Sequence, residues 1–188
     1  PKQAYFMMKK HIPNFITSLN LTSGFIAIIL AAGGDLTGAS WLIVAAMIFD
    51  FFDGFSARML KAYSDIGKEL DSLADVVSFG VAPAVIIYKM LIVALSHGMA
   101  PEGGLHPIVL VAALMPVCAA LRLAVFNLDS TQATGFKGLA TPANAIAVIS
   151  LVIAANYSGS DIISAAINSP LIIILLTVTL SLLMVSRT

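Results

Sequence analysis

Residues 50–58 read DFFDGFSAR, and residues 67–75 read GKELDSLAD. These two stretches lie within or beside long apolar segments, and together they contain four aspartates: Asp50, Asp53, Asp71 and Asp75. An aspartate at the centre of a membrane span costs about 2.5–3.5 kcal/mol on insertion scales, and less near the membrane surface. A chain that keeps four of them must neutralise their charge, and a bound cation is the first candidate.

The spacing of the aspartates places them in two pairs. The first pair is three residues apart and the second pair is four apart, so each pair shares one face of a helix. Small residues beside them, Gly54, Ala57 and Gly67, let a ligand or another backbone approach closely. The short basic connection between the stretches predicts two adjacent antiparallel helices whose carboxylates meet near one membrane surface.

Carboxylate oxygens without neighbouring His or Cys favour a hard cation such as Mg²⁺, Mn²⁺ or Ca²⁺ over zinc. Two such ions about 3.5–4 Å apart would clamp both oxygens of an in-line displacement at phosphorus. We therefore expect the four aspartates to hold Mg²⁺ or Mn²⁺, with a two-metal site favoured. The alternative is a set of structural ion pairs with Arg58 and the nearby lysines.

The composition is that of a membrane protein. Of the 188 residues, 59% are apolar and 11% charged, whereas soluble domains carry about 25% charged residues. Ten basic residues balance ten acidic ones, so nothing indicates a nucleic-acid partner. The single cysteine, Cys118, excludes a disulfide framework.

The hydropathy pattern predicts an all-α, polytopic membrane protein with a single domain over 1–188. Residues 1–14 are expected to form a short amphipathic segment on the inner membrane surface, with a disordered tail as the alternative. The chain stops directly after an apolar segment, so we expect the natural protein to continue past Thr188. Six stretches are long and apolar enough to span: 15–33, 39–59, 70–96, 106–127, 139–157 and 168–186.

Charge predicts the orientation of these spans. The connections near 34–38, 97–105 and 158–167 contain no Lys or Arg, whereas nearly all basic residues lie on the other side. The positive-inside rule makes that other side cytoplasmic, with both ends of the chain and all four aspartates facing it.

The spacing D-x-x-D-G-x-x-A-R, eight residues, G-x-x-x-D-x-x-x-D resembles the signature of the CDP-alcohol phosphotransferase family at every fixed position. Members are six-helix membrane enzymes, usually homodimers. They transfer a phosphoryl-linked group from a CDP-activated donor to an alcohol and release CMP. The resemblance covers nearly the whole chain and implies a bacterial or archaeal cytoplasmic membrane.

Flanking stretches are most similar to the branch that uses CDP-diacylglycerol and L-serine. They are residues 67–84, the N-terminal segment around Pro13 and Asn14, and the stretches 122–127 and 136–142. Two departures weaken the serine assignment: Val125 stands where an Arg is common, and Ala140 where a Pro is common.

The resemblance also implies roles for individual residues. Asp50, Asp53, Asp71 and Asp75 would hold the cations, and Asp75 would be the general base for the attacking hydroxyl. Gly54, Ala57, Gly67 and Asp71 would surround the CDP moiety. Arg58 suits a phosphate, or alternatively anchors the helix end at the membrane surface.

Residues for the acceptor alcohol are less sharply marked. Serine or phosphate would contact Arg122, Asn127, Ser78 and Lys137. Arg122 has an ion pair with Asp129 as its alternative, and Ser78 a hydrogen bond to its own helix.

Two rival functions stay open. One keeps the chemistry but uses another alcohol, such as glycerol-3-phosphate or an inositol phosphate. The other is an ion-coupled transporter, for which inverted repeats and broken mid-membrane helices are expected.

Overall fold

The computed structural model describes residues 2–96, 107–128 and 138–186, with side chains described from His11 onward except that of Val109. Within these ranges all regular secondary structure is helical. The elements are α1 (Lys2–Gly33), α2 (Leu36–Leu60), α3 (Asp65–Asp75), the π-helix η1 (Val76–Val81), α4 (Ala82–Leu95), α5 (Val109–Leu128), α6 (Thr141–Tyr157), α7 (Asp161–Ile167) and α8 (Pro170–Val185).

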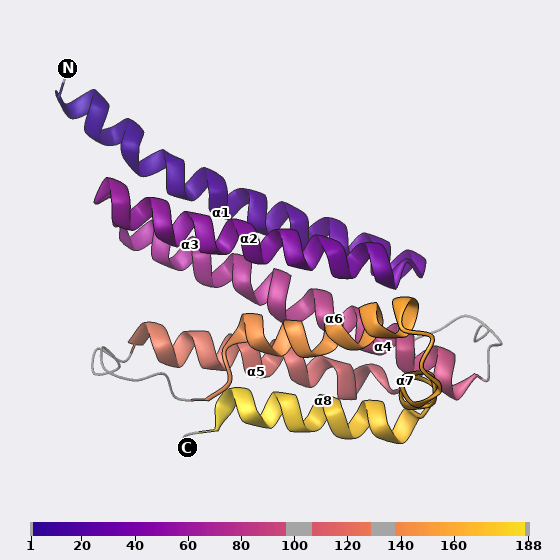
Figure 1. Cartoon of the computed structure of the whole chain (residues 1–188). Coiled ribbons are helices and arrows are strands. Elements are labelled where there is room, and N and C mark those ends of the chain that lie inside the picture. The colour runs from indigo at the N-terminus through magenta and orange to yellow at the C-terminus, as the bar shows by residue number, and fades with distance from the viewer. Residues whose placement is uncertain (1, 97–106, 129–137, 187–188) are drawn as a thin grey trace.

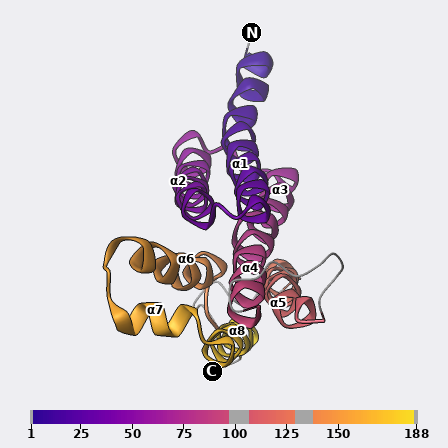
Figure 2. The same cartoon turned by 90° about the vertical axis from the view of Figure 1, so that its right-hand side faces the viewer.

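The helices form an elongated bundle around α4. Helices α1 and α2 pack along each other on one side of α4, and α5, α6 and α8 lie on its other side (Figures 1 and 2). The start of α1, the α2–α3 connection, the end of α5, the start of α6 and the end of α8 all lie toward the same end (Figure 1). All four aspartates belong to the elements that meet at this end.

The connection between α2 and α3 is set by local sequence. Helix α2 ends at Lys61, whose φ of 51° is left-handed and stops the helix. Helix α3 then starts at Ser64, whose Oγ accepts a hydrogen bond from the amide of Gly67 at 3.0 Å. This tight turn places Asp71 back beside the last turns of α2.

The structure confirms that the chain has several helices able to span a membrane, but it does not show the six that were expected. Four helices are long and apolar enough to span: His11–Gly33, Leu36–Leu60, Asp65–Leu95 and Leu110–Leu128. The α7 and α8 pair, bent by 77°, makes a fifth if it is counted as one span. The remaining expected span, at 139–157, falls on α6, which is apolar but has only 17 residues. A helix of that length rises about 26 Å, against a hydrocarbon core of about 30 Å.

The expected interfacial segment over 1–14 does not form a separate element. From Lys2 the backbone is helical and continues through Pro13 into the rest of α1. Proline removes one backbone donor, and here the helix continues past it. Of the two alternatives for this segment, the helix rather than the disordered tail is seen from residue 2 onward.

Small residues set the distance between the first two helices. Ala27, Ala31, Ala39 and Ala46 are completely buried. Side chains of this size let helix backbones approach closely. Larger buried side chains, among them Phe79, Ile86 and Leu91, fill the space around α4.

Candidate functional site

Three of the predicted carboxylates meet between α2 and α3. Asp50, Asp53 and Asp71 each offer one oxygen atom, and the three atoms all lie within 4.8 Å of one another. The prediction that the carboxylates of the two stretches come together is therefore confirmed.

The chemistry of this cluster fits a divalent cation. Among the described residues, one oxygen each of Asp53, Asp71 and Asp75 is buried and has no hydrogen-bond partner. Carboxylate oxygens as close as those of Asp50, Asp53 and Asp71 repel one another unless a cation lies between them. An all-oxygen set suits a hard cation, so these residues could hold a metal ion.

Asp75 occupies a different position from the other three. It lies outside the group of oxygens within 4.8 Å and is only 8% exposed, at the end of α3. The hydroxyl of Thr141, on α6, donates to its Oδ2 at 3.5 Å. Half-buried Arg122, on α5, is near enough for its charge to interact with that of Asp75. Asp75 therefore lies where α3, α5 and α6 converge.

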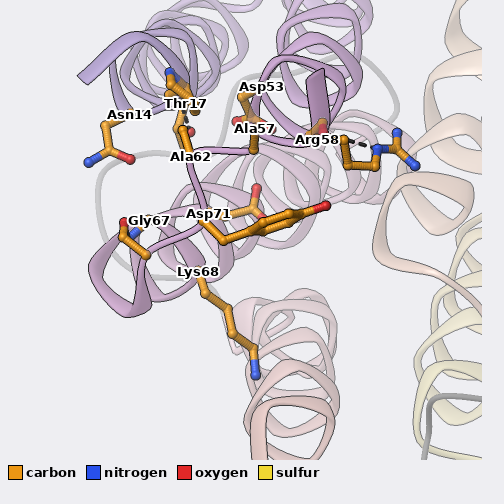
Figure 3. A pocket seen from close by; sticks show the side chains of 13 residues that line it. Asn14, Thr17, Asp53, Ala57, Arg58, Ala62, Gly67, Lys68 and Asp71 are labelled. Atoms are coloured by element: carbon orange, nitrogen blue, oxygen red, sulfur yellow. Dashed lines mark hydrogen bonds between the residues drawn. The ribbon is translucent and has the colours of Figure 1, made fainter. Parts of the chain in front are cut away.

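A cavity of about 310 Å³ opens beside the cluster (Figure 3). Its walls come from the first half of α1, the end of α2, the α2–α3 connection and the start of α3. The lining residues are Pro13, Asn14, Thr17, Asp53, Gly54, Ala57, Arg58, Ala62, Tyr63, Ser64, Gly67, Lys68 and Asp71. Because two cluster aspartates form part of its wall, a ligand in the cavity would meet a cation held there.

The two signature glycines serve this cavity in different ways. A Cβ atom added to Gly54 would meet no other group within 4 Å, so protein packing does not require a glycine there. A Cβ atom at Gly67 would lie 3.0 Å from the Oδ1 of Asn14 and equally close to the Oγ of Ser64. Gly67 thus lets α3 approach α1, whereas Gly54 leaves space in the cavity.

The basic residues of the cavity are engaged with backbone carbonyls. The Nε of Arg58 donates to the carbonyl of Gly54 at 3.1 Å, within its own helix. The side chain of Lys68 extends toward α5, where its Nζ donates to the carbonyl of Asn127 at 3.2 Å (Figure 3).

Several cavity residues were not predicted as site residues. Pro13, Asn14 and Thr17 come from α1, with Asn14 and Thr17 labelled in Figure 3. The hydroxyl of buried Thr17 donates to the carbonyl of Pro13 at 3.0 Å. Their only sequence signal is the resemblance of the N-terminal segment, which carries no role by itself. Tyr63 and Lys68 were likewise assigned no role.

The predicted acceptor residues lie elsewhere. Ser78 is completely buried in η1, and its Oγ donates to the carbonyl of Asn20 at 3.1 Å. The amide of Asn127 donates to the Oγ of Ser72 at 2.9 Å. Both contacts join helices, and neither residue lines the cavity. Lys137 and Asp129 lie outside the described residues.

Comparison with known proteins identifies the family. A sequence profile of CDP-alcohol phosphatidyltransferases matches residues 10–185, nearly the whole chain. The chain belongs to this family. The cluster and cavity described above are therefore those of a CDP-alcohol phosphatidyltransferase.

Similar curated proteins carry serine in their names. An archaetidylserine synthase of Methanothermobacter thermautotrophicus is 35% identical over 149 residues, which are 78% of this chain and 60% of that protein. A CDP-diacylglycerol–serine O-phosphatidyltransferase of Mycobacterium leprae is 40% identical over 149 residues, 75% of this chain and 46% of that protein. One of the same name from Methanocaldococcus jannaschii is 35% identical over 175 residues, 93% of this chain and 71% of that protein. The chain thus spans only about half of the length of some of these relatives.

Proposed function

We propose that this protein transfers the phosphatidyl group of CDP-diacylglycerol to the hydroxyl of L-serine, giving phosphatidylserine and CMP. The observation that carries the proposal is the group of carboxylate oxygens from Asp50, Asp53 and Asp71, within 4.8 Å of one another beside a cavity of about 310 Å³. An anionic cluster of this kind binds a diphosphate only through a cation, which is the chemistry a CDP donor needs.

The serine acceptor is supported by the relatives. Proteins named for serine transfer come from both bacteria and archaea, and each matches at least 70% of this chain. This distribution also supports a bacterial or archaeal membrane as the location.

We further propose that the bound cations are Mg²⁺ or Mn²⁺ and that two ions bind. Asp50, Asp53, Asp71 and Asp75 would hold them. Such cations would neutralise the donor diphosphate and the charge that develops on the departing CMP.

The chain's own residues would then perform the remaining steps. Asp75 takes the proton of the serine hydroxyl while the serine oxygen bonds to the β-phosphorus. The bond from that phosphorus to the oxygen of CMP breaks, so CMP leaves with the electron pair. Gly54, Ala57 and Gly67 leave room for the nucleotide.

We assign the binding of the acceptor alcohol to Arg122. Its guanidinium is near Asp75, and a guanidinium binds a carboxylate such as that of serine in a two-pronged geometry. Arg58 is proposed to contact the diphosphate once it exchanges its hydrogen bond with Gly54. Ser78 and Asn127 are assigned to helix packing instead, because their side chains already donate to other helices.

We propose six spans, with the aspartates facing the cytoplasm. Helices α6 and α8 lie alongside the four longer spans (Figure 1). Among the described residues, Arg58, Lys61 and Lys68 lie in or beside the α2–α3 connection at the end that carries the cluster. We also propose a homodimer, because members of the family that the sequence resembles are usually homodimers.

A different acceptor alcohol is the nearest rival, because it would use the same cluster and cavity. CMP release from CDP-diacylglycerol by purified protein in liposomes separates the two. We expect release that needs serine together with Mg²⁺ or Mn²⁺ and stops with EDTA. Release with glycerol-3-phosphate or an inositol phosphate, but not with serine, would overturn the serine assignment and keep the family chemistry.

A further inference from the structure

Helix α6 presents two buried polar side chains to Asp75 and to the π-helix that follows it. The Oγ1 of Thr141 donates to the Oδ2 of Asp75 at 3.5 Å, and the Nδ2 of Asn144 donates to the carbonyl of Phe79 at 3.4 Å. Thr141 is 1% exposed and Asn144 is completely buried. The two donors are three residues apart and so share a face of α6. This face therefore contacts both Asp75 and the π-helix that follows it.

The π-helix explains why such support is needed. Immediately after Asp75 the backbone changes from α3 to η1, Val76–Val81. A π-turn is an uncommon conformation that interrupts regular helical hydrogen bonding and concentrates at functional sites. The contact between Asn144 and Phe79 holds this segment from outside its own helix.

The start of α6 is itself anchored. The amide of Leu139 donates to the carbonyl of Leu183 at 2.9 Å. Gly138 has a φ of 79°, and a Cβ atom there would lie 2.8 Å from the carbonyl oxygen of Met184. Thr141 is therefore presented to Asp75 by a helix whose preceding residues, Gly138 and Leu139, are attached to the end of α8.

We propose that Thr141 is a positioning residue for Asp75. Its hydroxyl holds Oδ2 and thereby fixes the carboxylate orientation. The other oxygen, Oδ1, is buried and has no hydrogen-bond partner among the described residues, so fixing Oδ2 also fixes the direction in which Oδ1 faces the site. The proposal rests on the proposed function, because the proton transfer assigned to Asp75 belongs to that reaction.

A fixed carboxylate matters because proton transfer depends on geometry. The accepting oxygen must lie within hydrogen-bonding reach of the hydroxyl, and small misplacements are costly. The long Thr141 contact is of the kind that tightens when substrate binds. A hydroxyl placed one helix away can thus affect turnover without touching substrate.

Kinetics of matched variants test the proposal. Thr141→Val keeps the shape and removes the donor, whereas Thr141→Ser keeps the donor. Thr177→Val is the control, because Thr177 is also completely buried but its hydroxyl donates to Ile173 in its own helix. We expect Thr141→Val to lower kcat about 10–100-fold with KM for CDP-diacylglycerol changed less than about threefold. Thr141→Ser should restore most of kcat, and Thr177→Val should leave it unchanged.

Three kinetic results would overturn the proposal. They are full kcat in Thr141→Val, no recovery in Thr141→Ser, or an equal loss in Thr177→Val, which would indicate a general effect of a buried hydroxyl. If wild-type protein turns over only another alcohol, the serine assignment fails and the same variants are compared with that alcohol. A wild-type protein without any CMP release would overturn both the proposed function and this inference.

A readout without substrate tests the contact itself. Thermal unfolding in detergent is measured for wild type, Thr141→Val, Asp75→Ala and the double variant. We expect the two substitutions to be non-additive, because neighbours that share a hydrogen bond couple in such a cycle. Additive effects would exclude the contact between Thr141 and Asp75.

Discussion

At the residue scale, the aspartates are arranged for a ligand more than for the stability of the protein. Three of them share a volume a few ångströms across, and buried oxygens on Asp53, Asp71 and Asp75 have no partner among the described residues. Each such oxygen opposes folding unless something compensates it. A cation bound among Asp50, Asp53 and Asp71 would provide that compensation for Asp53 and Asp71.

Replacing Asp71 by Asn keeps the side-chain shape and removes one charge from the cluster. We expect Mn²⁺ affinity to fall at least about tenfold, because the remaining ligands carry less charge. The measurement is Mn²⁺ titration followed by electron paramagnetic resonance on protein in detergent. Asp35→Asn is the control, since Asp35 caps α2 through Gly38 and asparagine caps equally well. Unchanged Mn²⁺ affinity in Asp71→Asn would contradict the assignment of the cluster as a cation site.

Substitutions at two glycines distinguish a position that leaves space for a ligand from a position that helix packing requires to be glycine. Gly54→Ala should fold normally, because its Cβ meets no other group within 4 Å, yet KM for CDP-diacylglycerol should rise as the methyl group enters the cavity. Gly24→Ala should instead lose about 1–3 kcal/mol of stability, because its Cβ would lie 2.8 Å from the Cα of Ser78. Thermal unfolding and steady-state kinetics of both variants distinguish the two effects. A Gly54→Ala variant with unchanged KM would show that the cavity does not hold the donor.

The residues that sequence alone predicted are those with a local signal. The helical spacing of Asp50 with Asp53 and of Asp71 with Asp75 is visible along the chain, so their shared faces were predictable. Asn14 and Thr17 carry no such signal, because they enter the site only through the packing of α1 on α2 and α3. The hydrogen bond of Ser78 to the carbonyl of Asn20 was not predictable for the same reason, because the two residues lie 58 positions apart in the sequence.

At the scale of elements, hydropathy located the long helices but not their internal breaks. The predicted span 70–96 is observed as α3, η1 and α4, starting at Asp65. No apolar pattern marks a π-turn, because Val, Phe and Gly occur equally in regular helices. The bend of 77° between α7 and α8 was likewise not predicted.

The contact between α3 and α5 gives a prediction at this scale. Asn127 donates to Ser72 at 2.9 Å and its carbonyl accepts from Lys68. We expect Asn127→Ala to lower the free energy of unfolding by about 1–3 kcal/mol, because the hydrogen bond to Ser72 is lost. KM for serine should stay unchanged.

Asn168→Ala is the control for this variant, since the amide of Asn168 donates only within one helix turn, to Ser164. Thermal unfolding is compared with serine kinetics for both variants. An unchanged free energy of unfolding together with a raised KM for serine would show that Asn127 belongs to the acceptor site.

At the scale of the whole molecule, the bundle has two chemically different ends. The end with the cluster carries the α2–α3 connection, and the opposite end carries the α1–α2 turn and α7 (Figure 1). This polarity agrees with the charge distribution along the sequence, which was sufficient to predict the orientation proposed here. The charge distribution does not predict the length of α6, because that length depends on the helix starting at Thr141.

The proposed orientation predicts which positions an impermeant maleimide reaches in intact cells. In a Cys118→Ala background, Ser158→Cys should be labelled, and Ile66→Cys should be labelled only after permeabilisation. Both native side chains are exposed, and the two positions lie at opposite ends of the bundle. The reverse labelling pattern would contradict a cytoplasmic site.

The most direct test of the central claim is the incorporation of radiolabelled L-serine into lipid. Purified protein in liposomes that contain CDP-diacylglycerol is assayed with Mg²⁺, with Mn²⁺ and with EDTA, and compared with Asp75→Asn. We expect labelled phosphatidylserine and an equal amount of CMP with either metal, and neither product with EDTA or in the variant. Serine incorporation that persists in EDTA, or CMP release without any serine-containing lipid, would contradict it.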